Sequence, residues 1–289
     1  MEHITTSRTA MALVVVAAFI YGLGIVFAIG GYAALTPTTF GTALGLLHAA
    51  GWLRAVGWAA ALAAVCAAGW ELLRRGTWAS ASEVGAGALG TLLIAIGMLI
   101  NATSAESNPA SSVVGAVGVG VWALLALSRA ARRSLAGQES ASEGIAVPRE
   151  GMLWLLAAGG LFVLAIGAGL TPDFISKGTG VAAGAVQAVG VAILFGVLAA
   201  ARARGGLTSR AAPVTLAGLA CLAMGFTAAA VVSGAVFGPD ATLAGLRAGV
   251  LVVVAIQMAA VVVLGLAAWL RVREAVAQPP MTPAALRRA

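Results

Sequence analysis

Few side chains in this 289-residue sequence can take part in chemistry, because 61% of the residues are hydrophobic and only 9% are charged. An amide or hydroxyl group inside a long apolar run needs a partner, since an unsatisfied polar group in hydrocarbon costs several kcal/mol. Four such residues lie well inside apolar runs and are our candidate substrate-binding residues: Tyr21, Gln187, Thr227 and Gln257. We expect them to line a small polar cavity; alternatively, each makes one interhelical hydrogen bond and serves only to hold helices together.

A second set of candidates lies near the ends of apolar runs, on the side that we predict to be external. His48, Arg54 and Asp173 could form the outer mouth of a binding site. The alternative is that they are solvated residues at the membrane surface with no binding role.

The sequence lacks the residues that most cofactors and catalytic sites require. It contains two histidines, His3 and His48, and two cysteines, and it has no CxxC, HExxH or GxxxxGK[ST] motif. No lysine, aspartate or glutamate lies in the middle of an apolar run, so we expect neither a Schiff base nor an intramembrane proton relay. We therefore expect no metal, no cofactor and no enzymatic activity.

Two acidic residues have a simple structural interpretation. Glu83 lies at the start of the third apolar run, where a carboxylate suits the positive end of a helix. Asp240 follows Pro239 and is expected to be the N-cap of the last helix.

The elements that carry these residues are predicted to be membrane-spanning helices. A soluble domain has about 25% charged residues, far above the 9% found here. A bilayer core of about 30 Å is crossed by about 20 apolar residues in a helix. Eight runs meet this requirement, at 10–34, 55–73, 84–100, 110–127, 152–170, 180–201, 212–236 and 245–270.

The start of the second run is set by Arg54. An arginine at the centre of a span costs about 2.5–3.5 kcal/mol, so we begin this span beside Arg54. The preceding segment, 42–52, is then predicted to be a short interfacial helix on the membrane surface.

The distribution of basic residues predicts the orientation. With the amino terminus in the cytoplasm, 14 of the 17 basic residues fall on the inner side, as the positive-inside rule requires. We predict an all-α integral membrane protein with eight transmembrane helices and both termini cytoplasmic. The excess of arginine over lysine, together with abundant Ala, Gly and Val, is typical of GC-rich bacterial genomes, so we expect a bacterial plasma (inner) membrane.

A short similarity predicts an internal duplication into two parallel four-helix halves. The segment 28–30, followed by LTPTTF at 35–40, resembles 165–167, followed by LTPDF at 170–174. Four spans return the chain to its starting side, so both copies would have the same orientation. The expected division is a first half at 1–128, a cytoplasmic linker at 129–151, a second half at 152–270 and a mobile tail at 271–289.

These features favour a permease for an uncharged or lipid-like small molecule, with its site between the two halves, because no buried charge is expected to meet an ionic substrate. The alternative is a non-catalytic integral membrane subunit or scaffold of a larger complex. The expected partners are the lipid bilayer, with anionic headgroups at the cytoplasmic face, and a further membrane protein in the scaffold case. The basic charge is explained by topology, so we expect no nucleic-acid partner.

Overall fold

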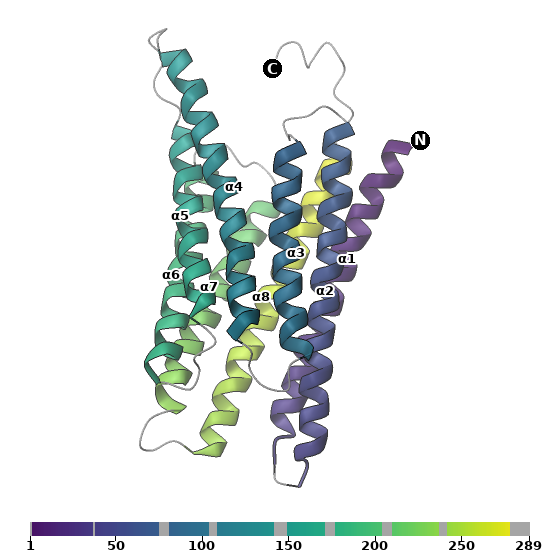
Figure 1. Ribbon diagram of the computed structural model, residues 1–289, viewed down its shortest axis with the longest axis vertical. Coiled ribbons are helices and arrows are strands. Elements are labelled where there is room, and N and C mark those ends of the chain that lie inside the picture. The colour runs from purple at the N-terminus through teal and green to yellow at the C-terminus, as the bar shows by residue number, and fades with distance from the viewer. Residues whose placement is uncertain are drawn as a thin grey trace.

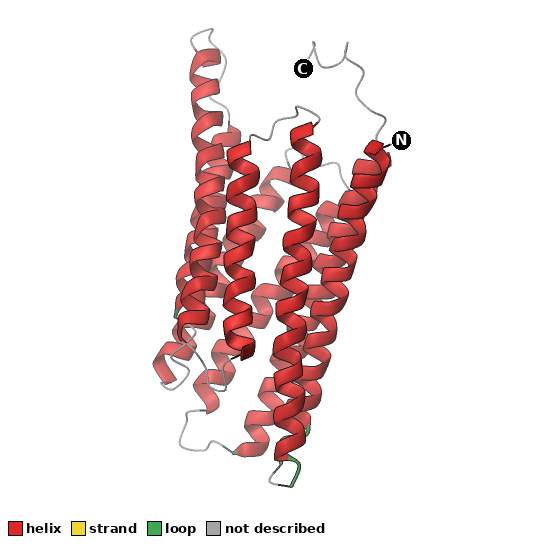
Figure 2. Cartoon of the chain, turned by 45° about the vertical axis from the view of Figure 1, so that its right-hand side comes forward, coloured by secondary structure: helices red, strands yellow, loops and turns green. Residues whose placement is uncertain are grey.

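The computed structural model describes residues 2–36, 38–74, 81–103, 109–141, 149–170, 177–203, 210–236 and 242–277. Almost all of these residues are helical, and a short turn is described between the first two helices (Figure 2). The helices are α1 (Glu2–Ala33), α2 (Phe40–Arg74), α3 (Ala81–Thr103), α4 (Pro109–Ala141), α5 (Arg149–Gly169), α6 (Lys177–Ala203), α7 (Ala211–Val236) and α8 (Leu243–Ala277).

All eight helices contain a segment long and apolar enough to cross a membrane. Seven of these segments agree with the predicted spans to within a few residues; they include Thr9–Ala33, Gly180–Ala203 and Arg247–Leu270. The prediction of an all-helical chain with eight candidate membrane spans is confirmed, and the chain has the structure of a multi-pass membrane protein.

The helices are arranged as a closed antiparallel ring. Each described helix packs against its neighbours in sequence, and α1 also packs against α8, which closes the ring. No other pair of helices makes backbone contact within the described part of the chain. The start of α1 and the end of α8 therefore lie at the same end of the bundle (Figure 1).

The predicted interfacial helix at 42–52 is wrong, because this segment is the first third of α2. The continuous α2 is 35 residues long, about 52 Å at 1.5 Å per residue. Gly51 lies against Ala102, one residue before the end of α3, so residues 40–50 extend about 16 Å beyond α3. Figure 1 shows the α1–α2 hairpin reaching past the ends of α3 and α4. Residues 42–52 pack along α1 in this extension, which gives them a helical partner that a lone surface helix would lack.

Glycine allows the close approach of neighbouring helices. A Cβ atom at Gly97 of α3 would lie 2.6 Å from the carbonyl oxygen of Ser111 on α4. A Cβ atom at Gly184 of α6 would lie 2.8 Å from the backbone nitrogen of Ala230 on α7. Because lipid provides no hydrophobic force between helices, this close backbone packing is a main source of their attraction.

The exposed residues of each of α7 and α8 fall on a single face. On α8 the exposed apolar residues include Val252, Val262 and Leu266, and on α7 they include Met224 and Val231. Their spacing places them on one side of each helix, with buried or half-buried residues on the other. Side chains therefore fill much of the ring along these helices, and the exposed faces are the surfaces available to lipid.

Candidate functional site

Three polar or aromatic side chains lie together on the face of the α1–α2 pair that points into the ring. They are Tyr21, Arg54 and Trp58. The Tyr21 and Trp58 rings meet edge to face, with centroids 6.4 Å apart and an interplanar angle of 88°. Arg54 joins them because its Cγ faces Gly24 of α1, three residues after Tyr21, and because Gly57, three residues after Arg54, faces the Cβ of Tyr21. We call these three residues the Arg54 cluster.

The neighbours of α1 and α2 show that this cluster faces into the ring. On α1, Tyr21 lies between Ala18, which contacts α8, and Gly24, which contacts α2. On α2, Arg54 lies between Gly51, which contacts α3, and Gly57, which contacts α1. Both side chains are half-buried, so they point between neighbouring helices and away from the exposed faces.

The Arg54 cluster has more donors than acceptors. The indole nitrogen of Trp58 is fully buried and has no hydrogen-bond partner. Among the described residues, Arg54 makes one hydrogen bond, from its Nε to the carbonyl oxygen of Ala50, 3.2 Å away. Within the described part of the chain, the Tyr21 hydroxyl has no partner either. The cluster thus holds three donor groups, and no described carboxylate pairs with any of them.

Arg54 also changes an expectation from the sequence. The candidate span Phe40–Trp70 includes it, so the prediction that the second span begins beside Arg54 is wrong. From the contact between Gly51 and Ala102, Arg54 lies about 5 Å inside the outer end of α3. The small residues Gly24 and Ala50 leave room for its side chain against α1.

The structure places the other three substrate-binding candidates on different helix pairs. Gln187 is buried on α6, and its Cγ faces Gly167 of α5. Gln257 is half-buried on α8, and its Cγ faces Gly225 of α7. Thr227 is on the exposed face of α7, and its hydroxyl donates to the carbonyl oxygen of Ala223 at 2.9 Å. Thr227 thus lies outside any site within the ring.

The outer-mouth candidates do not form one cluster. His48 is exposed on α2 and accepts a hydrogen bond at its Nε2 from the indole N–H of Trp52, 3.1 Å away. The His48–Trp52 pair lies on the face of α2 that points away from the ring, whereas Arg54 faces the interior of the ring. Asp173, like Asp240, lies outside the described residues. At the start of α8, the N-cap contact is made by Thr242, whose Oγ1 accepts from the backbone N–H of Gly245 at 3.1 Å.

A second charged cluster was not predicted. Glu83 of α3 is only 6% exposed, and its Oε1 lies 2.7 Å from Nη2 of Arg132 and 3.3 Å from Nε of Arg129, both on α4. The Arg129 guanidinium lies 5.3 Å from the ring centre of Trp154 on α5. Glu83 is thus an ion-pair partner that joins α3 to α4. Sequence spacing gave no indication of this contact, because the partners are 46 and 49 residues apart.

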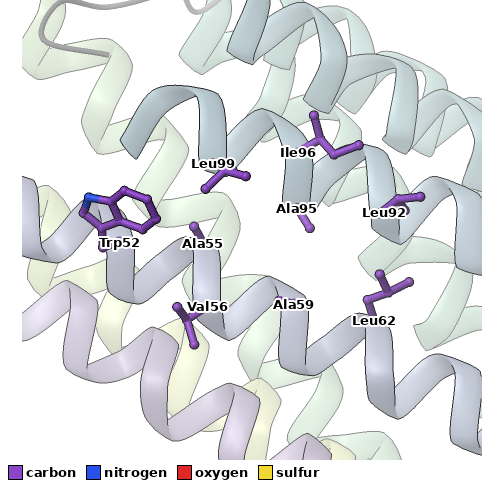
Figure 3. Close-up of a pocket in the computed structure, with 9 residues that line it drawn as sticks. All are labelled: Trp52, Ala55, Val56, Ala59, Leu62, Leu92, Ala95, Ile96 and Leu99. Atoms are coloured by element: carbon purple, nitrogen blue, oxygen red, sulfur yellow. The ribbon is translucent and has the colours of Figure 1, made fainter. Parts of the chain in front are cut away.

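An apolar groove of about 260 Å³ lies between α2 and α3 (Figure 3). Its lining is Trp52, Ala55, Val56, Ala59, Leu62, Leu92, Ala95, Ile96 and Leu99. The single polar group of this set, the N–H of Trp52, is already donated to His48. The groove therefore offers nothing that would orient a polar substrate, and it lies on a different side of α2 from the Arg54 cluster.

The chain shows no significant similarity to any protein-family model, curated protein or solved structure with which it was compared. The function must therefore be argued from the fold and from these two clusters.

Proposed function

We propose that the chain is a permease for a small lipid-like molecule, with its site inside the ring between two parallel four-helix halves. The observation that carries this proposal is the pair of inward-facing polar residues, Arg54 in the first half and Gln187 in the second. An ionisable residue within a membrane span is costly and usually functional. The absence of backbone contact across the ring supports the same proposal, since it leaves the interior to side chains alone.

Matching contacts in the two halves support an internal duplication. Gly24 of α1 faces the carbonyl oxygen of Ala50 and Cγ of Arg54 on α2. Gly167 of α5 faces the carbonyl oxygen of Ala183 and Cγ of Gln187 on α6. The α2 residues correspond to α6 residues 133 positions later, so Arg54 and Gln187 are equivalent.

The third and fourth helices of each half repeat the pattern. Gly90 of α3 lies against Trp122 of α4, and Gly218 of α7 lies against Leu264 of α8. Seven residues along each glycine helix, Gly97 lies against Gly115, and Gly225 lies against Gln257. In both contacts, the α7 residue lies 128 positions after its α3 counterpart, and the α8 residue lies 142 positions after its α4 counterpart.

The sequence contains a matching internal repeat around Arg54. The segment 49–59 reads AAGWLRAVGWA and the segment 182–192 reads AAGAVQAVGVA, with seven identical residues in eleven. This repeat pairs Gly24 with Gly167, whereas the similarity between the outer loops pairs Gly30 with Gly167. The contacts favour the first pairing, which implies that α1 is about two turns longer than α5 at its outer end.

The remaining features of the proposal concern orientation and location. The distribution of basic residues supports a cytoplasmic location for the end of the bundle that carries both termini, and the arginine-rich composition supports a bacterial inner membrane. In this orientation the Arg54 cluster lies toward the outer side, and the Glu83–Arg129–Arg132 cluster lies at the inner side.

The second candidate function is that of a non-catalytic scaffold. On α7 and on α8, only one face is exposed, so the opposite faces pack against other side chains inside the ring. An interior filled in this way favours a scaffold, because it leaves little space for a substrate. A scaffold would recruit its partner through the lipid-facing surface or the cytoplasmic end.

Reconstitution separates the two functions. The purified protein in sealed liposomes should accelerate the flux of at least one small amphiphile over protein-free liposomes, and Arg54→Gln should reduce that flux. A protein that carries no amphiphile of a broad panel, but purifies from its native membrane in a stoichiometric complex, would instead be a scaffold.

A further inference from the structure

We infer that the Arg54 cluster binds an anionic oxygen group, so that the molecule carried is a monoanion with an apolar body. This inference deepens the proposed permease function and concerns the same site. It replaces the uncharged substrate that the sequence favoured.

The first step is the imbalance between donors and acceptors. The buried indole N–H of Trp58 has no acceptor, and the guanidinium of Arg54 has a backbone carbonyl as its one partner. Buried polar groups are almost always satisfied, and each exception requires an explanation. An acceptor supplied by a ligand explains both residues at once.

The second step is the charge of that acceptor. Arg54 forms no ion pair with any described carboxylate, and Glu83, the one buried carboxylate among the described residues, is bound to Arg129 and Arg132 instead. An arginine in a membrane span is stabilised by an opposite charge. A carboxylate or phosphate oxygen accepts from guanidinium in shorter and stronger hydrogen bonds than a neutral carbonyl does.

The third step is geometric. Arg54 and Trp58 are four residues apart on α2 and therefore lie on the same face. Side chains of a helix lean toward its N-terminus, so the ring of Trp58 covers the turn that carries Arg54. The indole of Trp58 and the guanidinium of Arg54 therefore lie within about one turn of each other on the face of α2 that points into the ring. The two oxygens of one carboxylate can then accept from the two residues.

The fourth step is the number of charges. The position equivalent to Arg54 in the second half holds Gln187, which is neutral. Among the described residues, the interior of the ring therefore presents one cation at this level. Tyr21 and Trp58 place aromatic surface beside this cation. The cluster therefore suits a ligand that has an apolar body and one negative charge.

The test is a binding measurement on the intact purified protein in nanodiscs of phosphatidylcholine. The probes are benzoate, acetate and phosphate, tested one at a time at constant ionic strength, with benzamide as the neutral match of benzoate. We expect benzoate to raise the melting temperature and benzamide to have little effect. Arg54→Gln should weaken benzoate binding about 10-fold to 100-fold, and Trp58→Phe, which keeps a ring and loses the N–H, about 3-fold to 10-fold.

Two variants serve as controls. Trp52→Phe removes an indole N–H that is donated to His48, outside the cluster, and should leave binding unchanged. Arg54→Lys keeps the charge and should retain the preference for benzoate over benzamide, so the test holds even where Arg54→Gln fails to fold.

The source of the anionic group is resolved by a second set of nanodiscs that contain phosphatidylglycerol. Competition of this lipid with benzoate would assign the site to a lipid headgroup, and a lack of competition would assign it to a free solute. The inference is overturned if none of the three anions stabilises the wild type more than the Arg54→Gln protein. Because no flux is measured, this failure would leave intact a permease for neutral molecules, which the liposome assay tests separately.

Discussion

Arginine contributes in two contrasting ways at the scale of single residues. Arg132 and Arg129 share Glu83 at one end of the bundle, so each of the two guanidinium groups has a carboxylate partner. Arg54 has no carboxylate partner among the described residues and lies beside two further donors. The first arrangement joins two helices, whereas the second is the basis of the proposed anion site.

Glu83→Gln should destabilise the protein because it leaves two guanidinium groups without a counter-ion. Arg132 is 53% exposed, so solvent screens part of this effect, and we expect a loss of about 1–3 kcal/mol, between the values for exposed and buried ion pairs. Thermal unfolding in nanodiscs measures the change. Ser128→Ala, which affects a weaker 3.4 Å contact to Arg132, is the control and should change the melting temperature much less. Equal stability of wild type and Glu83→Gln would show that the ion pair is dispensable.

At the scale of helices, the structure depends on glycines that allow backbones to touch. Their positions explain how the backbones of α3 and α4, and likewise of α6 and α7, come so close to each other. The small-residue spacing is visible in the sequence, but a chain with 38 glycines offers many such spacings, and spacing alone does not indicate which of them meet a neighbour.

Gly97→Ala should lower stability, because the added methyl group would lie 2.6 Å from the Ser111 carbonyl oxygen and 3.0 Å from the Gly115 nitrogen. We expect a cost of about 1–3 kcal/mol, typical of overpacking. Gly85→Ala on the same helix has no neighbour within 4 Å and should be neutral or slightly stabilising, since alanine favours helix. Thermal unfolding of the two variants side by side measures the difference. Equal effects would mean that α3 and α4 do not approach as closely as described.

Much of the fold follows from the sequence, because a span is a local property of hydrophobicity and length. Seven candidate spans were predicted nearly to the residue. The continuity of α2 was not predicted. An arginine inside a span is costly, and the sequence does not show that Gly24 on α1 provides space for the Arg54 side chain. The predicted start of the second span was therefore wrong because it depends on a tertiary contact between α1 and α2.

The candidate site was less predictable than the fold. Tyr21, Arg54 and Gln187 were singled out by type and depth, and all three face into the ring. Trp58 was not among the predicted site residues, and its unpartnered N–H depends on packing that no sequence pattern reports. Thr227 was selected by depth alone, and depth does not distinguish the inner face of a helix from the exposed one.

At the scale of the whole molecule, eight antiparallel helices in a ring place the start of α1 and the end of α8 at one end. The arginine distribution predicts that this end is cytoplasmic. The α1–α2 turn would then be external, at the tip of the hairpin that extends beyond α3.

Cysteine labelling in intact cells tests this orientation. In a chain with Cys66 and Cys221 replaced by serine, Thr38→Cys should react with a membrane-impermeant thiol reagent added from outside, because Thr38 is exposed in the turn before α2. A cysteine in place of Gly144 should react only after the membrane is opened. The opposite pattern would invert the topology and place the Arg54 cluster toward the cytoplasm.

The central claim is that the ring encloses a binding site open to the outer side. Accessibility of Arg54→Cys and Trp58→Cys to the same impermeant reagent, in the same cysteine-free background, measures it most directly. Thr227→Cys, on the exposed face of α7, is the lipid-facing control. We predict that both α2 cysteines react from outside, that the control does not, and that benzoate slows the reaction at Trp58→Cys. Two α2 cysteines as unreactive as the control would show a filled interior, and with it a scaffold instead of a permease.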